Sequence, residues 1–186
     1  GKSVTIAADI LESMVRQTIF STGDPNGSKP VLSGIKYEIG GGEIKLIAVD
    51  GFRLAVRKEK LDTDRELSFI VPAKAMSEVL KLSAGEGEIK LNVSNRHIIF
   101  EIGGYEVISR LLEGEFIDYK RTIPVNVCTK VTANTADMID TIERISQVII
   151  ERLKTPISCN FEDNTFHASC VTELGNAQDE IPVKIE

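Results

Sequence analysis

Residues 46–57 place a charged and several apolar side chains next to a turn, a pattern that suits a binding surface. Two short apolar runs flank the pair Asp50-Gly51. An Asp-Gly pair between β-prone runs predicts a tight hairpin, because Gly takes a positive φ without steric cost and Asp tolerates it. Phe52, Arg53 and Leu54 follow, and successive strand side chains point to opposite faces. The segment fits either a binding surface or an ordinary hairpin with one arginine reaching into solvent, and by itself it leaves both open.

Other residue types that could support catalysis do not occur in a catalytic arrangement. No nucleophile stands beside a base, and the run Gly40-Gly41-Gly42 is not followed by the Lys-Ser or Lys-Thr of a phosphate-binding loop. The Gly103-Gly104 pair is typical of a hairpin turn. Asp62 and Asp64 lie in a loop of mixed charge, where solvated carboxylates are the simpler interpretation. We therefore predict a protein that is not an enzyme and needs no cofactor.

Cysteine and histidine give no indication of a metal site. Cys128, Cys159 and Cys170 are odd in number and lack C-x-x-C spacing, so neither a disulfide framework nor a zinc site is predicted. Cys159 and Cys170 are expected to pack as small apolar side chains in strands. His97 and His167 lie far apart in the sequence, and we predict no metal or catalytic role for either.

Length and composition indicate an ordinary globular chain of one or two domains. The 186 residues are 42% hydrophobic and 27% charged, without a low-complexity tract. No apolar run is long enough to span a bilayer, so a cytoplasmic protein without membrane contact is expected. The net charge of −6 argues against a generally basic nucleic-acid-binding protein. A local basic surface is still compatible with it.

The pattern of apolar residues and turns repeats three times along the chain, each time as one strand, one helix and three strands. The expected helices cover residues 9–20, 74–82 and 135–151. The expected strands cover residues 3–7, 31–39, 43–50, 52–60, 67–71, 88–93, 97–102, 105–111, 127–133, 157–162, 165–172 and 176–185. The fold class predicted from these elements is α+β, with repeated βαβββ units.

The three units start at regular intervals. Asp9, Lys74 and Asp137, near the helix starts, are 65 and 63 residues apart, and the letters of residues 8–11 resemble those of residues 136–139. A regular period of this length indicates a repeat architecture. Two such units can bury their helices and sheets in one shared core. We therefore expect a complete domain over residues 1–122 and half of a second domain over residues 123–186.

Three long segments resemble the bacterial sliding clamp family, the beta subunit of DNA polymerase III. They are residues 46–57, residues 69–82 and residues 97–124, and Cys170-Val171-Thr172-Glu173-Leu174-Gly175 extends the similarity into the third unit. Members of this family have three domains of two units each, with antiparallel sheets outside and helices lining the inner face. They close head to tail into a homodimeric ring around duplex DNA. The chain resembles the middle domain and the first half of the third domain.

The resemblance implies a peptide-binding groove and the function of a processivity factor. In the family this groove receives short linear motifs from the DNA polymerase III alpha subunit, the clamp loader and other partners with clamp-binding motifs. Phe52 stands where many relatives carry His, and Ile117 where many carry Pro. The positions carried over are Leu32, Val49, Gly51, Phe52, Arg53, Leu54, Ile117, Arg121 and Thr122. The alternative is a stand-alone peptide-binding module of the same fold that does not encircle DNA.

The resemblance also implies a surface that faces DNA without reading its sequence. In the family, basic side chains of the helices approach the phosphates, which gives salt-sensitive, sequence-independent contact. The corresponding residues are Arg16, Lys29, Lys74, Lys81, Arg144 and Arg152. Acidic residues on the same helices should keep this contact weak, and solvated charges on helix faces are the alternative interpretation of each residue.

Overall fold

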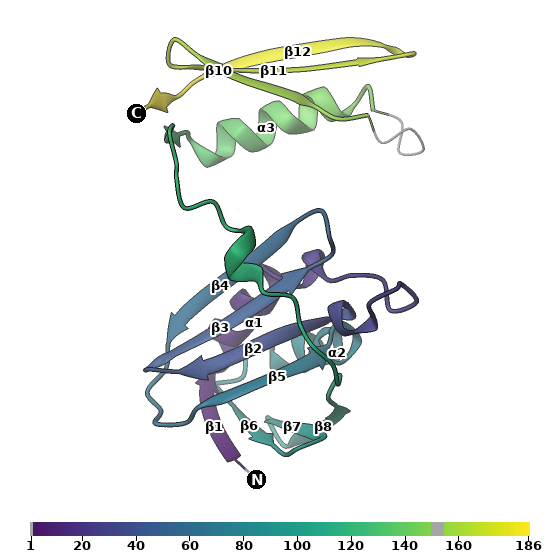
Figure 1. Ribbon diagram of the computed structural model, residues 1–186, viewed down its shortest axis with the longest axis vertical. Helices are drawn as coiled ribbons and strands as arrows, with labels where there is room; N and C mark the ends of the chain where they lie inside the picture. Colours follow the sequence, from purple (N-terminus) through teal and green to yellow (C-terminus); the bar gives the residue numbers. More distant parts are fainter. Residues whose placement is uncertain (1, 150–154) are drawn as a thin grey trace. The chain divides into compact units, whose positions relative to one another are not determined.

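The computed structural model describes residues 2–149 and 155–186 and contains two compact units (Figure 1). Unit 1 comprises residues 1–122 and unit 2 comprises residues 123–186. Each unit has its own hydrophobic core. No helix in the described part of the chain is long and apolar enough to cross a membrane.

Unit 1 contains two four-stranded antiparallel sheets with the strand orders β1-β6-β7-β8 and β4-β3-β2-β5. The first sheet is formed by β1 (Lys2–Ala7), β6 (Glu88–Val93), β7 (His97–Ile102) and β8 (Tyr105–Arg110). The second is formed by β2 (Gly34–Gly40), β3 (Glu43–Val49), β4 (Leu54–Lys60) and β5 (Leu67–Pro72).

The two repeats of unit 1 exchange their first strands. β1 belongs to the first repeat but pairs with β6 of the second, with Ile6 opposite Ile89. β5 belongs to the second repeat but pairs with β2 of the first, with Tyr37 opposite Phe69. Each sheet therefore needs both repeats, which makes unit 1 a single folded body.

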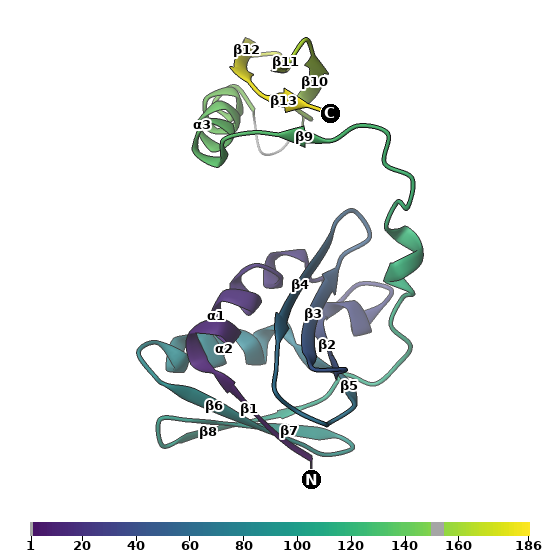
Figure 2. The ribbon, with the colours of Figure 1, turned by 90° about the vertical axis from the view of Figure 1, so that its left-hand side faces the viewer.

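Both helices of unit 1 lie side by side in the angle between the two sheets (Figure 2). They are α1 (Ala8–Arg16) and α2 (Ala73–Ser83). Leu11 and Met14 of α1 and Met76 of α2 are fully buried in a core that includes residues from both sheets. The apolar residues recur at helical spacing and so form one face, which explains why these segments fold as amphipathic helices.

Three element boundaries in unit 1 differ by more than one residue from the sequence-based expectation. Helix α1 ends at Arg16, and residues 19–21 form a separate 3-10 turn, η1 (Ile19–Ser21), because Thr18 donates to the Met14 carbonyl at 2.8 Å and terminates the ladder. Strand β2 begins at Gly34, since residues 30–33 form the 3-10 turn η2 (Pro30–Ser33). Strand β4 begins at Leu54, since residues 50–53 form a loop.

Unit 2 packs one helix on a three-stranded antiparallel sheet. The helix is α3 (Thr135–Ser146), and the sheet order is β10-β11-β12. The strands are β10 (Ser158–Glu162), β11 (Thr165–Thr172) and β12 (Gly175–Pro182), while β9 (Val131–Thr132) and β13 (Lys184–Ile185) form a separate short pair. The expected strand over residues 127–133 is therefore mostly an exposed segment without regular secondary structure.

The start and end of α3 also correct the expectation. The Asn134 side chain accepts from the backbone N–H groups of Ala136 and Asp137 at 2.9 and 3.2 Å, and this cap sets the start at Thr135. The helix ends at Ser146, and the predicted continuation to residue 151 extends into residues outside the described ranges. The three helices start at Ala8, Ala73 and Thr135. Aligning the first and third repeats on their helix starts therefore shifts the alignment by one residue from the one based on matching letters.

The two strand cysteines of unit 2 differ in environment. Cys170 is buried in the core of unit 2, as expected. Cys159 is exposed, because every residue of the edge strand β10 is exposed to solvent. The expectation that Cys159 packs as a small apolar side chain is therefore wrong.

Candidate functional site

An apolar cluster covers the face of the β4-β3-β2-β5 sheet that points away from the helices. We call it the outer cluster. Along β3, Ile44 and Leu46 enter the main core, whereas Ile47 and Val49 point to the opposite face, as strand alternation requires. Its buried members are Leu32, Ile47, Val49, Ile70, Phe116 and Tyr119, and Val31, Leu54, Leu112 and Ile117 pack against them.

The segment that follows β8 crosses the outer cluster and is fixed to the sheet by three contacts. The Leu112 N–H donates to the Ile70 carbonyl of β5 at 2.9 Å. The Lys36 ammonium lies 5.4 Å from the centre of the Phe116 ring. The Tyr119 hydroxyl donates to Glu38 Oε2 at 2.9 Å. Residues 111–122 therefore form part of the surface rather than a free linker.

Tyr119 and Glu38 form a partly buried polar contact at the edge of the outer cluster. Burial raises the pKa of Tyr119 to about 12, and its hydrogen bond to Glu38 acts in the same direction. For Glu38, burial acts to raise the pKa, but hydrogen bonds from Lys36 and Tyr119 and nearby lysine charges outweigh it, so the pKa lies below its usual value. Both pKa shifts thus favour an ionised Glu38 and a neutral Tyr119 near neutral pH.

Replacing Tyr119 with phenylalanine should raise the pKa of Glu38, because the variant loses one of the hydrogen bonds that stabilise the carboxylate. A carboxyl with a depressed folded-state pKa contributes stability above its unfolded pKa, and this contribution is lost as the pH falls through the folded value. The variant should therefore lose less stability on acidification. A carbon-detected NMR titration of Glu38 measures the shift. Tyr105→Phe removes an exposed hydroxyl as a control, and an equal shift in that variant would contradict the assignment.

The loop between β3 and β4 is organised by one carboxylate. Asp50 Oδ1 accepts from the backbone N–H groups of Phe52 and Arg53 at 3.0 and 3.1 Å, and Asp50 Oδ2 accepts from Arg53 Nε at 2.9 Å. The backbone N–H of Phe52 is the main cause that lowers the pKa of Asp50, and the Arg53 contacts add to it. Gly51 supplies the positive φ of 94°. The hairpin therefore has a four-residue loop instead of the expected tight turn at residues 50–51.

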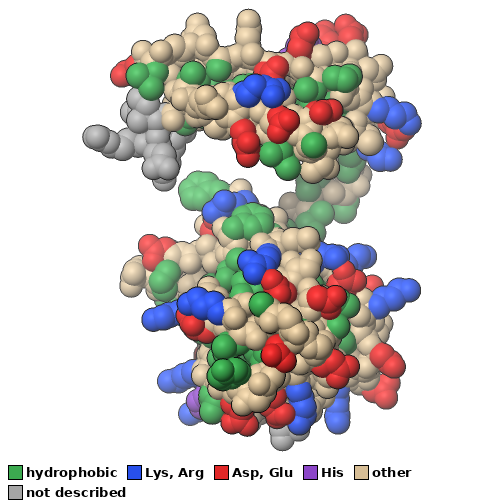
Figure 3. All heavy atoms as spheres, turned by 180° about the vertical axis from the view of Figure 1, so that it is seen from behind, with side chains coloured by type: hydrophobic (Ala, Val, Ile, Leu, Met, Phe, Trp, Pro, Cys, Tyr) green, Lys and Arg blue, Asp and Glu red, His purple; other side chains and the backbone are tan. Residues whose placement is uncertain are grey.

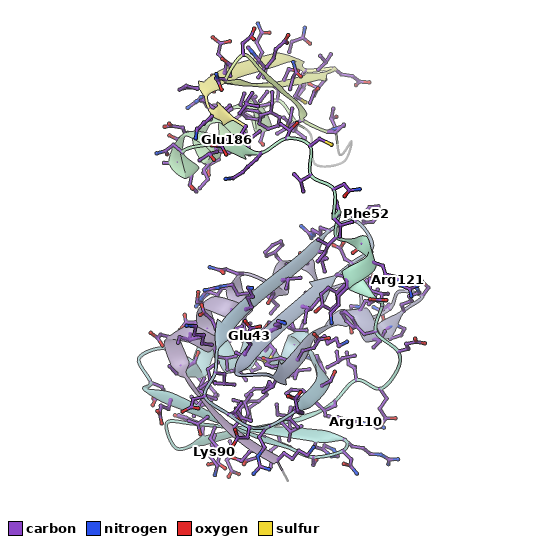
Figure 4. All side chains as sticks on the ribbon, turned by 60° about the vertical axis from the view of Figure 1, so that its left-hand side comes forward. Glu43, Phe52, Lys90, Arg110, Arg121 and Glu186 are labelled. Atoms are coloured by element: carbon purple, nitrogen blue, oxygen red, sulfur yellow. The ribbon has the colours of Figure 1, made fainter. Side chains whose placement is uncertain are left out.

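The outer cluster brings together four of the nine groove residues named from the sequence. Leu32 and Val49 are buried in it, and Leu54 and Ile117 pack against it. The other five lie in the loop or in the chain segment beside the sheet. Figure 4 places Phe52 at the tip of the β3–β4 hairpin and Arg121 in η3 (Tyr119–Thr122).

The side chains outside the cluster are mostly in solvent. Phe52 is 99% exposed, so it does not form part of an apolar wall. The Arg121 side chain is 88% exposed and pairs with Asp118 at 3.0 Å. Thr122 donates to the Tyr119 carbonyl at 2.6 Å and closes the last turn of η3. In the free chain, these residues border the outer cluster and do not line it.

Sequence reasoning missed several members of the outer cluster. Ile47 could have been found, because the run from Leu46 to Val49 lacks the alternation of a strand with one solvated face. Phe116 and Tyr119 carried no such signal, because their burial depends on where residues 111–122 cross the sheet. Phe20, which is not a member of the cluster, was missed because its ring meets Arg53 only through a contact between distant segments.

Surface hollows lie beside the outer cluster and elsewhere on unit 1. A cavity of about 520 Å³ lies between Val31, Phe116 and Ile117, with Lys29 and Asp118 at its edges. A larger cavity of about 1060 Å³ borders β5 and the β6–β7 turn, but it contains none of the predicted site residues. The cavity beside Ile117 therefore extends the candidate surface.

Most of the described cations proposed to face DNA are paired with acids. Arg16 contacts Glu12 at 2.7 Å, Lys81 contacts Glu78 at 2.8 Å, and Arg144 contacts Asp179 at 2.5 Å. Lys29 and Lys74 are exposed, and Arg152 lies outside the described residues. Figure 3 shows basic and acidic side chains interspersed over the visible face of unit 1. Local pairing reduces the positive potential that these residues could offer to phosphates.

Known proteins with matching sequences and structures identify the family. Residues 5–118 match the model of the family described as DNA polymerase III beta subunit, central domain. The chain belongs to this family. The beta sliding clamp of Staphylococcus epidermidis is 30% identical over 182 residues, which are 96% of this chain and 48% of the relative, and that of Staphylococcus aureus (strain Mu50) is 29% identical over the same lengths. The chain thus spans about half the length of the curated relatives it matches.

Solved structures of beta subunits share the fold across the whole chain. A putative DNA polymerase III beta subunit from Eubacterium rectale has a TM-score of 0.94 at 27% identity, covering 100% of this chain and 51% of its own. The polymerase sliding clamp from Bacillus subtilis has a TM-score of 0.91 at 25% identity, covering 100% of this chain and 50% of its own. The predicted α+β clamp fold is confirmed. Within residues 2–149 and 155–186, no three potential metal ligands cluster.

Proposed function

We propose that the chain is part of a cytoplasmic DNA sliding clamp, a non-catalytic processivity factor that tethers the replicative polymerase to duplex DNA. Unit 1 corresponds to the middle domain of the clamp and unit 2 to the first half of its third domain. The observation that carries the proposal is the outer cluster, an apolar surface beside a rigid loop in a chain of the beta-subunit family. The complete protein would close as a homodimeric ring.

The outer cluster supports recognition of short linear peptides. Leu54 and Ile117 are only partly buried, so they offer apolar surface at its edge, and Arg53 stands next to Leu54 in the chain. Extended peptides bind such surfaces through apolar anchors, while a few polar groups fix their register. The partners would be the DNA polymerase III alpha subunit, the clamp loader and other proteins with clamp-binding motifs.

Contact with DNA would be weak and independent of sequence. The paired cations Arg16, Lys81 and Arg144 keep part of their charge neutralised by neighbouring carboxylates. Weak phosphate contact suits a protein that must move along the duplex. The exposed Lys29 and Lys74 would provide the less neutralised contacts.

Peptide binding tests the proposal directly. A fluorescein-labelled peptide of the Gln-Leu-x-Leu-Phe type should bind saturably, and Leu54→Ala combined with Arg53→Ala should weaken binding at least about tenfold, because an apolar anchor contact and a polar contact are both lost. Fluorescence anisotropy measures the affinity. Ile108→Ala removes an exposed apolar side chain from the other sheet and serves as the control. No binding by the folded chain, or equal binding by the double variant, would contradict the proposal.

A further inference from the structure

The Arg53 side chain is held by two groups outside the outer cluster. Asp50 Oδ2 accepts from Arg53 Nε at 2.9 Å, and the guanidinium carbon lies 5.5 Å from the centre of the Phe20 ring. Both distances are within the usual range for a charge-assisted hydrogen bond and a cation–π contact. Phe20 belongs to η1, far from the hairpin in sequence, so the arginine is fixed between two separate elements.

The two contacts leave the outer edge of the guanidinium available. A guanidinium has five N–H donors in a planar fork, and the Asp50 contact uses only the one on Nε. Among the described residues, neither Nη atom of Arg53 donates a hydrogen bond. The Arg53 side chain remains 58% exposed, whereas the Asp50 side chain is only 16% exposed. The guanidinium is therefore oriented through its Nε side, and its Nη side is open to solvent.

The carboxylate that orients Arg53 is itself well fixed. Asp50 Oδ1 accepts two backbone N–H groups of the loop, so rotation of the carboxylate would break them as well as the arginine contact. Val49 and Leu54, which flank the loop, are paired in the sheet and belong to or pack against the outer cluster. The position of the fork is thus tied to the position of the apolar surface.

From this geometry we infer that Phe20 and Asp50 are positioning residues that hold the Nη edge of Arg53 ready for an oxygen acceptor of a bound peptide. The acceptor is a main-chain carbonyl or a carboxylate, because both match the donors of a guanidinium fork. This inference rests on the proposed peptide-binding function. It adds a residue, Phe20, that is not a member of the outer cluster but determines how firmly Arg53 is held.

The first test needs no ligand. In NMR spectra of the free protein, the Nε–H resonance of Arg53 should shift in both Asp50→Asn and Phe20→Leu, because the first change removes the charged acceptor and the second removes the ring. Asparagine keeps an oxygen for the two backbone N–H groups, so the loop itself should be preserved. Tyr105→Leu removes another exposed aromatic ring and should leave the resonance unchanged. An unshifted Arg53 resonance in both variants would overturn the inference.

The second test measures the same peptide affinity in a double-mutant cycle. Phe20→Leu should weaken binding about three- to fivefold in the wild-type background and have almost no effect in the Arg53→Ala background. Phe20→Tyr keeps the ring and should bind like the wild type. Equal losses in both backgrounds would overturn the positioning role. If the folded wild-type chain binds no peptide, the proposed function fails instead, and the Arg53 resonance still decides whether Phe20 and Asp50 hold the side chain.

Discussion

Replacing Tyr37 with alanine should lower the free energy of unfolding of unit 1 by about 3–5 kcal/mol, as expected for an aromatic side chain removed from a close-packed core. Tyr37 lies on β2 and is fully buried. Its ring stacks on Phe69 of β5 with centroids 5.0 Å apart, and its hydroxyl donates to the sulfur of Met76 on α2 at 3.2 Å. The side chain thus connects both repeats, and its loss would leave a cavity between them.

Tyr37→Phe separates the ring from the hydroxyl. This variant keeps the stacking and removes only a weak hydrogen bond to sulfur, so it should cost less than about 1 kcal/mol. Burial raises the pKa of the Tyr37 hydroxyl far above its usual value, so this group stays neutral at any working pH. Hydrogen exchange of residues 34–40 and 67–72 measures the stability of unit 1, with residues of unit 2 as an internal reference. Equal losses in both variants would contradict the packing argument.

Replacing Gly34 with alanine should destabilise unit 1 by about 1–3 kcal/mol, as is typical of overpacking. A Cβ at this position would lie 2.5 Å from the Val71 carbonyl oxygen, 2.8 Å from Leu112 Cδ1 and 2.9 Å from Ile70 Cγ2. The carbonyl belongs to a paired strand and cannot move freely. Leu112 and Ile70 belong to the outer cluster, so the strain should also weaken peptide binding severalfold.

Gly87→Ala is the matched control for Gly34→Ala. A Cβ at Gly87 would meet no atom within 4 Å, and its backbone does not lie in the left-handed region. Hydrogen exchange and fluorescence anisotropy should therefore show no loss in this variant. If Gly34→Ala were as stable as Gly87→Ala and bound peptide equally well, the close approach of β2, β5 and the segment after β8 would not matter for the site.

The sequence predicted most elements of unit 1, because their apolar periods and turn residues are local signals. Helix α2 and strands β6 and β7 lie within one residue of their predicted bounds. The errors arise where a polar side chain competes for nearby backbone groups, which the apolar pattern does not reveal. The β3–β4 loop is longer than predicted because Asp50 caps two N–H groups, and α1 ends early because Thr18 captures a carbonyl.

The residues of the candidate site were also predicted only in part. Leu32, Val49, Leu54 and Ile117 were named through the family resemblance, and the structure places them in one cluster. Phe116 and Tyr119 were missed because nothing local predicts that their segment covers a sheet face. Neither the pairing of Lys81 with Glu78 nor that of Arg144 with Asp179 was predicted, since both depend on side-chain geometry.

The exchange of first strands affects how the chain can fold during synthesis. β1 leaves the ribosome before β6, which lies far along the chain, and cannot pair until β6 has been made. Pairings between such distant segments are slow to form, since the intervening loop must close before any contact stabilises it. An exposed β1 edge would meanwhile be free to pair with other chains. We therefore expect residues 1–60, when expressed without the second repeat, to aggregate instead of forming a stable half.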